Sequence, residues 1–174
     1  GDLTDFGTAE EYKRFCNIME PLEIPYRVIP GNHDNVSKMR TSFSDKDWMP
    51  NSGPINWTAE FPDIALIGLD TNVDGKSHGL LTANSLNYLE EKLAVFGTKP
   101  VIVATHHPPV ITGIEKMDIQ NLRDSDKLKL VCGHIHRNIV AQFGSVICQI
   151  GPGTSHAVSM DLREGAPNCL TKEP

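Results

Sequence analysis

The sequence predicts one α/β domain over residues 1–174, in which helices cover a buried sheet. Short apolar runs alternate with segments whose apolar residues recur at helical spacing. Three of the apolar runs end in loops rich in histidine, asparagine and aspartate, and ligands of open α/β sheets collect at such strand ends. The length of 174 residues is within the usual size of one domain.

The first part of the chain predicts a helix and then a short strand. Thr8 and Glu11 fit the S/T-x-x-E capping box, and apolar residues follow at helical spacing until the chain reaches Pro21. A strand is expected over residues 26–29, because prolines bound this apolar run on both sides.

The middle of the chain predicts a strand, a helix and a second strand. Residues 63–70 contain a continuous apolar run that is typical of a buried strand. A helix is expected to begin at Thr82 and to end at Gly97, with leucines along one face. The apolar residues 101–104 then predict another buried strand.

The last part of the chain predicts a third helix and three further strands. The helix is expected to follow Asp118, and a strand is expected over residues 128–132. Residues 138–143 and 146–150 predict an antiparallel pair, because Gly144 supplies a turn between them.

Composition limits the classes of partner. The net charge of −6 argues against a nucleic acid polymer or a membrane surface as partner, because both are polyanionic. A small phosphate substrate is still compatible, since bound divalent cations reverse the local field. The four cysteines are widely spaced and lack a C-x-x-C pair, so we expect reduced thiols and a cytoplasmic location.

The polar loops at the strand ends carry candidate metal ligands. Imidazole, carboxylate and amide oxygen together are the ligand set of a first-row dication such as Zn, Mn, Fe or Co. The residues that offer these groups lie in Gly31-Asn32-His33-Asp34, in Thr105-His106-His107-Pro108-Pro109, in Gly133-His134-Ile135-His136 and at Asp2 and Asp5.

Each loop also has a plain structural interpretation. A capped turn explains the first or the second loop when it is taken alone. His134 and His136 are stronger candidates, because residues two apart in extended backbone share a face. His156 follows a glycine-rich turn that could bring it to the substrate, but structural packing is the favoured interpretation. Turn formation accounts for Asp70 and Asn72 as well as a place near the site does.

Taken together and in this order, the motifs resemble a known family. Gly1-Asp2-x-x-Asp5, Gly31-Asn32-His33-Asp34, His106-His107-Pro108-Pro109 and Gly133-His134-x-His136 are similar to the blocks of calcineurin-like metallophosphoesterases. The 105–109 block and Met117-Asp118 resemble the class III cyclic-nucleotide phosphodiesterases, and glycerophosphodiesterases of the same branch share these features.

The resemblance implies a role for each matching residue. Asp2 would bridge two divalent metal ions, Asn32, His106 and His134 would complete the second-metal site, and His136 would bind the first metal. His33 would act beside the phosphate as general acid or charge stabiliser, oriented by Asp34.

The resemblance also implies a fold, with one departure. We expect a sandwich of two sheets flanked by helices, without the first strand–helix–strand unit of the family. The family's Asp-x-His block has no counterpart before Asp2, so an N-terminal part is expected to be missing and the C-terminus can be truncated as well. The chain is then expected to hold one ion well and a second poorly, whereas the full-length protein would hold two.

The activity implied is hydrolysis of a small phosphodiester, such as 3′,5′-cyclic AMP or a glycerophosphodiester, by a metal-bridging hydroxide. Two alternatives remain open at this point: a phosphomonoesterase or protein phosphatase of the same fold, and a non-catalytic metal-binding fragment. A homo-oligomer is also left open by the sequence.

Overall fold

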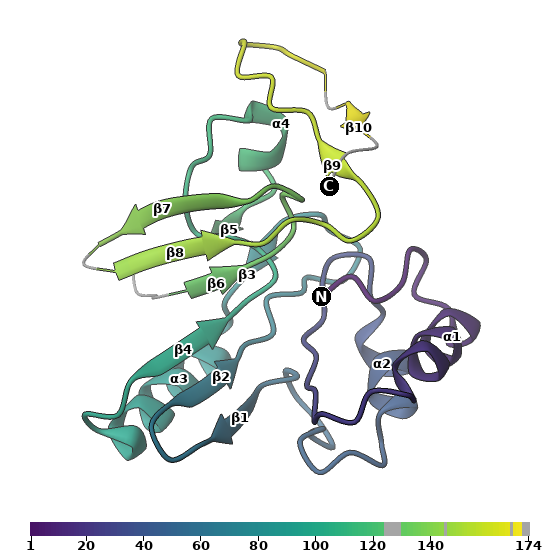
Figure 1. Cartoon of the computed structure of the whole chain (residues 1–174), viewed down its shortest axis with the longest axis vertical. Helices are drawn as coiled ribbons and strands as arrows, with labels where there is room; N and C mark the ends of the chain where they lie inside the picture. The colour runs from purple at the N-terminus through teal and green to yellow at the C-terminus, as the bar shows by residue number, and fades with distance from the viewer. Residues whose placement is uncertain (124–129, 145, 168, 172–174) are drawn as a thin grey trace.

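The fold is α/β, as the sequence predicts (Figure 1). The computed structural model describes residues 1–123, 130–144, 146–167 and 169–171. Its largest sheet has six strands in the order β1-β2-β4-β6-β8-β7, in which β2, β4, β6 and β8 run parallel and β1 and β7 are antiparallel edges. In place of a second large sheet, the described residues form two sheets of two strands each, β9 with β10 and β3 with β5.

The strands are short, and five of the strands predicted from the sequence coincide with them, namely β2, β4, β6, β7 and β8. The sheets contain β1 Trp57–Glu60, β2 Ala65–Gly68, β3 Gly79–Leu80, β4 Val101–Ala104, β5 Leu122–Arg123, β6 Leu130–Cys132, β7 Ile139–Phe143, β8 Val146–Ile150, β9 Ala157–Val158 and β10 Leu170–Thr171. The helices are α1 Ala9–Met19, α2 Val36–Ser42, α3 Ala83–Phe96 and α4 Glu115–Asp118.

Side-chain caps fix the two long helices where the sequence predicts them. Thr8 and Glu11 form both bonds of the capping box at the start of α1. Thr82 accepts a hydrogen bond from the Ser85 amide at the start of α3, and Gly97 ends that helix with a positive φ. None of the helices in the described part of the chain has the length and apolar character needed to cross a membrane.

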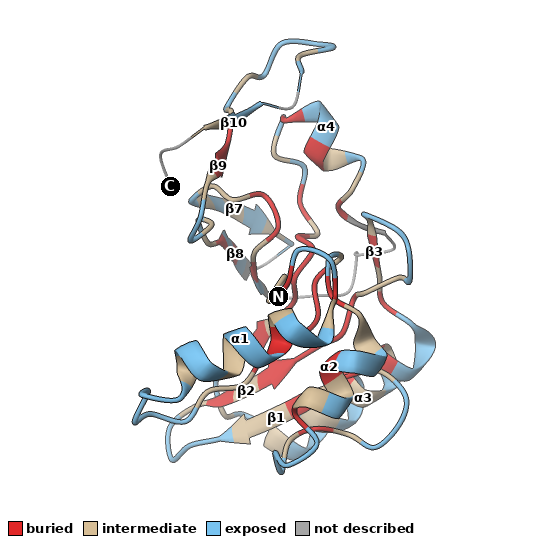
Figure 2. Cartoon of the chain, turned by 90° about the vertical axis from the view of Figure 1, so that its right-hand side faces the viewer, coloured by how far each residue is buried: buried red, intermediate tan, exposed pale blue. Residues whose placement is uncertain are grey.

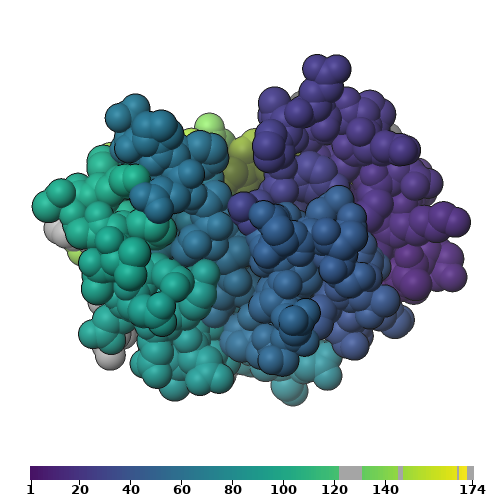
Figure 3. Space-filling model, turned by 90° about the horizontal axis from the view of Figure 1, so that it is seen from below, coloured from purple at the N-terminus to yellow at the C-terminus, as the bar shows by residue number. Residues whose placement is uncertain are grey.

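Two hydrophobic clusters hold the fold together. One lies between the large sheet, α3 and α4 and includes Ile67, Val103 and Ile150. The other surrounds Tyr12 and Phe43 and joins α1 to α2. Figure 2 shows the buried segments meeting near the N-terminus, where the strand ends face α1 and α2. Seen from below, the purple N-terminal segment lies at one side of the surface and the teal residues around α3 lie at the other (Figure 3).

Two sequence predictions are wrong, and six short elements were missed: α2, β1, β3, β5, β9 and β10. Residues 26–29 form no strand, because among the described residues no other strand lies alongside to pair with them. The helix expected after Asp118 instead ends there, since the Asp118 carboxylate folds back to accept hydrogen bonds from Thr112 and Gly113. Neither α2 nor β1 was expected, and residues 128 and 129 of the predicted strand lie outside the described residues.

Candidate metal centre

Parallel pairing of β4 with β6 brings two histidine loops together. His106 and His134 each follow the carboxyl end of their strand, and the Gly133 amide donates to the His106 carbonyl at 3.0 Å. The N-terminal segment that carries Asp2 and the turn 31–34 reach the same point.

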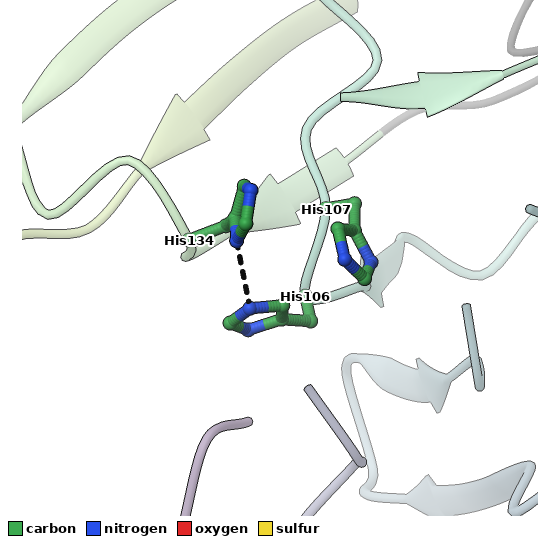
Figure 4. Close-up of side chains that lie close together, drawn as sticks. All are labelled: His106, His107 and His134. Atoms are coloured by element: carbon green, nitrogen blue, oxygen red, sulfur yellow. Dashed lines mark hydrogen bonds between the residues drawn. The ribbon is translucent and has the colours of Figure 1, made fainter. Parts of the chain in front are cut away.

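The His106 ring is the centre of this cluster. Its Nε2 lies 3.1 Å from Asp2 Oδ2, 3.2 Å from Asn32 Oδ1 and 3.1 Å from His134 Nδ1. Figure 4 shows the hydrogen bond that joins the His106 and His134 rings, with His107 beside them. The structure therefore brings together four side chains that the sequence singled out separately.

These separations fit the spacing of atoms that share one metal ion. With metal–ligand bonds of about 2.1 Å, neighbouring ligand atoms lie about 3.0 Å apart in an octahedron and about 3.4 Å apart in a tetrahedron. The three measured distances fall between these values. Two imidazoles, a carboxylate and an amide oxygen are also a suitable donor set for a first-row dication.

A second grouping of donors overlaps with this one. Ring nitrogens of His106, His107 and His134 lie within 4.8 Å of one another. Nδ1 of His107 is already hydrogen-bonded to Thr71 Oγ1 at 2.8 Å, and its ring packs edge-on against His106 with centroids 4.8 Å apart. We favour the set around His106 Nε2, because its separations are shorter and match a ligand shell.

The electrostatics of the cluster put each group in the form that binds a metal. Burial alone would raise the pKa of Asp2, but the hydrogen bond from His106 and the His33 amide together hold it well below its usual range. Burial lowers the pKa of His106, and burial with the neighbouring charge of His106 lowers that of His134 to about 3. An ionised carboxylate and neutral imidazoles are the protonation states that metal binding requires.

His33 is held by Asp5, which corrects one expectation. His33 Nδ1 lies 3.0 Å from the Asp5 carbonyl oxygen and 3.5 Å from its carboxylate. Asp34 instead is buried and accepts hydrogen bonds from the amides of Leu3 and Gly31. Its carboxylate thus ties the Asp2 loop to the 31–34 turn, and the prediction that it orients the His33 ring does not match this geometry.

His136 lies apart from the cluster, against His156. The two ring centroids are 4.4 Å apart, and among the described residues no hydrogen-bond partner faces the buried Nδ1 of His136. Asp2, His134 and His136 all have positive φ, so tight backbone turns aim these side chains. His156 lines the same pocket as His136, which agrees with the alternative interpretation of its sequence position, an approach to the substrate, which the sequence favours less than structural packing.

A pocket of about 630 Å³ opens over these groups. Asp2, His33, His106, His134 and His136 line it, together with the segment 151–156. Asp34 and Asn32 are not among the lining residues. Four of the five predicted ligands and the predicted proton donor thus face one space large enough for a small substrate.

The decisive comparison is with a protein family. Residues 1–138 match the family described as calcineurin-like phosphoesterase. The chain belongs to this family. The match ends two residues after His136, so it includes every residue that the sequence singled out as a ligand or catalytic group.

Individual proteins with similar sequences support the assignment to this family. The chain is 39% identical to a probable glycerophosphodiester phosphodiesterase of Arcobacter nitrofigilis, over 100% of the chain and 68% of the relative. It is 26% identical to a cAMP/cGMP dual specificity phosphodiesterase of Mycobacterium tuberculosis, over 97% of the chain and 59% of the relative. The chain therefore spans about three-fifths to two-thirds of the length of these proteins.

A solved structure shows the same fold. The protein TT1561 of Thermus thermophilus superposes with a TM-score of 0.64 at 14% identity, over 94% of this chain and 80% of the other. At this identity the likeness concerns the fold alone.

Proposed function

We propose that the protein is a metal-dependent phosphodiesterase that cleaves a small phosphodiester, such as 3′,5′-cyclic AMP or a glycerophosphodiester. The observation that carries the proposal is the convergence of Asp2, Asn32 and His134 on the Nε2 atom of His106. Relatives named as glycerophosphodiester and cyclic nucleotide phosphodiesterases support the substrate class.

Asp2, Asn32, His106 and His134 would hold one divalent ion, of Mn, Fe, Zn or Co. Asp2 and His136 would contribute to a second ion in the whole protein. Divalent ions supply Lewis-acid polarisation of a phosphoryl oxygen and activation of water for attack on phosphorus. The residues fit this use, because their donor atoms converge, are at least partly buried and belong to groups in the right protonation state.

His33 would supply the proton that the leaving oxygen needs. The Asp5 carbonyl can only accept a hydrogen bond, so Nδ1 of His33 must carry a hydrogen, which leaves Nε2 for the substrate. A protonated His33 would then donate from Nε2 to the departing alkoxide. The side chain is about half exposed and lines the pocket, so it can reach a bound phosphodiester.

The wall opposite His33 would bind the rest of the substrate. Ser155 donates to or accepts from His156 at 2.9 Å, and both line the pocket beside His136. Polar groups on this segment suit the hydroxyl groups of a ribose or a glycerol. The negative net charge and the free cysteines support the further proposals that no nucleic acid polymer or membrane is the partner and that the protein works in the cytoplasm.

The test is a comparison of two chromogenic substrates with the purified full-length protein and Mn²⁺. We expect bis(p-nitrophenyl) phosphate to be hydrolysed at least about tenfold faster than p-nitrophenyl phosphate, and EDTA to abolish both reactions. A preference for the monoester would instead support a phosphomonoesterase. Assays with cyclic AMP and glycerophosphocholine then separate the two substrate classes.

A further inference from the structure

The segment that follows β2 contacts two parts of the candidate metal centre, the 31–34 turn and His107. The chain leaves β2 through Leu69 and Asp70 and continues as Thr71 and Asn72. Asp70 and Thr71 are buried, and Asn72 is half-buried, although all three are polar residues in a loop. From the sequence, turn formation explains Asp70 and Asn72 as well as a place near the site does, and Thr71 is not singled out.

The Asn72 side chain is hydrogen-bonded to both ends of the turn that carries Asn32 and His33. Its Nδ2 donates to the Gly31 carbonyl at 2.5 Å and to the Asp34 carbonyl at 3.3 Å. These two carbonyls mark the first and last residues of the turn, which is closed by a bond from the Asp34 amide to Gly31. One amide group therefore fixes both ends of the segment that presents Asn32 to His106.

Thr71 acts on the opposite side, through His107. Its hydroxyl is 2.8 Å from His107 Nδ1, and both side chains are fully buried. The His107 ring packs against His106 and also against His134, with centroids 4.8 and 4.7 Å apart. A fixed His107 ring thus limits the orientations available to both imidazoles.

Asp70 holds this segment in place. Its carboxylate accepts from the Asn72 amide at 2.8 Å and from the Ile55 amide at 2.9 Å. Its own amide donates to Asn56 Oδ1 at 2.9 Å. The segment is thereby anchored to the loop before β1 independently of any bound ion.

We propose that Thr71 and Asn72 are positioning residues, which set the distance between the Asn32 side and the His106–His134 side of the centre. This inference rests on the proposed function only for the predicted loss of turnover. The predicted loss of metal affinity does not depend on that function. Hydrogen-bonded groups that support metal ligands typically change metal affinity or activity by about 10- to 100-fold when they are removed.

Two substitutions test the proposal, with Mn²⁺ as the probe. Asn72→Ala removes both bonds to the turn, and we expect Mn²⁺ affinity to fall by about 10-fold and kcat by about 10- to 100-fold, with KM changed less than about threefold. Thr71→Val keeps the buried volume and removes the bond to His107, so a decrease of several-fold is expected even if Asn72→Ala folds poorly. Thr71→Ser retains the hydroxyl and should restore both values.

The matched control is Asn121→Ala, away from the centre. Asn121 is buried and its Nδ2 donates to the Val110 carbonyl at 2.8 Å, so this change also removes a buried amide–carbonyl bond. We expect a lower melting temperature with Mn²⁺ affinity within about twofold of wild type.

The outcomes separate the two proposals. If wild type binds Mn²⁺ without hydrolysing phosphodiesters, the proposed function fails, while the Mn²⁺ affinities still test the positioning role. The positioning role is overturned if Asn72→Ala and Thr71→Val bind Mn²⁺ as wild type does, or if affinity follows melting temperature equally in all variants, Asn121→Ala included. A wild-type protein that binds no Mn²⁺ overturns both.

Discussion

The two sides of the pocket differ in how far their donor atoms converge. On the His106 side, an ionised carboxylate, an amide oxygen and an imidazole nitrogen surround one buried nitrogen at 3.1 to 3.2 Å. On the His136 side, the ring packs against the ring of His156, with centroids 4.4 Å apart. Its buried Nδ1 has no hydrogen-bond partner in the described part of the chain, which is also true of Nε2 of His134 on the other side. The comparison teaches that one ligand set is assembled, whereas the other offers only a part of one.

The largest effect is expected when the imidazole of His106, the central group of the assembled ligand set, is removed. We expect His106→Ala to lower kcat/KM at least about 10³-fold and to eliminate tight Mn²⁺ binding, because three donors lose their common neighbour. His136→Ala should leave tight Mn²⁺ binding within about fivefold of wild type. Steady-state kinetics and isothermal titration calorimetry measure both, and equal loss of tight binding in the two variants would contradict the distinction.

A smaller effect is expected from the His33 side chain, which is not one of the proposed ligands; its contact with Asp2 is made by the backbone amide, which a substitution retains. His33→Ala should lower kcat about 10²-fold, because it removes the proposed proton donor, while the amount of bound metal stays the same. Turnover with saturating Mn²⁺ and metal analysis of the same sample provide the measurement. An unchanged turnover would reject the catalytic role.

Two glycines, Gly31 beside Asp2 and Gly153 beside His136, allow the same substitution to be made next to each of the two ligand sets. A Cβ on Gly31 would collide with Asp2 Oδ1, and a Cβ on Gly153 would lie 2.8 Å from the His136 ring. We expect Gly31→Ala to weaken Mn²⁺ binding about 10-fold and Gly153→Ala to change it less than about threefold. Titration calorimetry on both variants would contradict the account if their order were reversed.

The last expected effect concerns a different quantity, the pH dependence of stability without metal. The pKa of His134 is lowered to about 3 and that of His107 to about 2, chiefly by burial, so the unfolded chain binds more protons below pH 6.5. Stability should therefore fall as the pH decreases from about 6.5, by up to about 1.4 kcal/mol per pH unit for each such histidine. Urea unfolding at pH 7.5, 6 and 5 in EDTA tests this, and a constant free energy of unfolding would contradict it.

Local signals in the sequence predicted most of the long elements. The caps at Thr8 and Thr82 and the apolar runs of β2 and β4 depend on neighbouring residues alone. The approach of His134 to His106 also followed, because the carboxyl ends of the parallel strands β4 and β6 meet at one edge. That argument does not explain Asn32, since no strand precedes it.

Long-range contacts explain what the sequence could not predict. His33 and Asp34 are adjacent, yet a turn sends their side chains to different neighbours, Asp5 and the Leu3 amide. The bond from Asn72 to the Gly31 carbonyl joins residues 41 positions apart, and no local pattern specifies it. The strand expected at 26–29 does not form for the same reason. A strand must pair with a neighbouring strand, and the local sequence does not specify whether one is present.

The number of ions bound by the chain of residues 1–174 tests the central claim most directly. Titration with Mn²⁺, followed by metal analysis after gel filtration, should give one tightly bound ion per chain, which His106→Ala eliminates. Two ions of equal affinity, or one ion that survives His106→Ala and disappears in His136→Ala, would contradict the assignment of the complete ligand set to the His106 side.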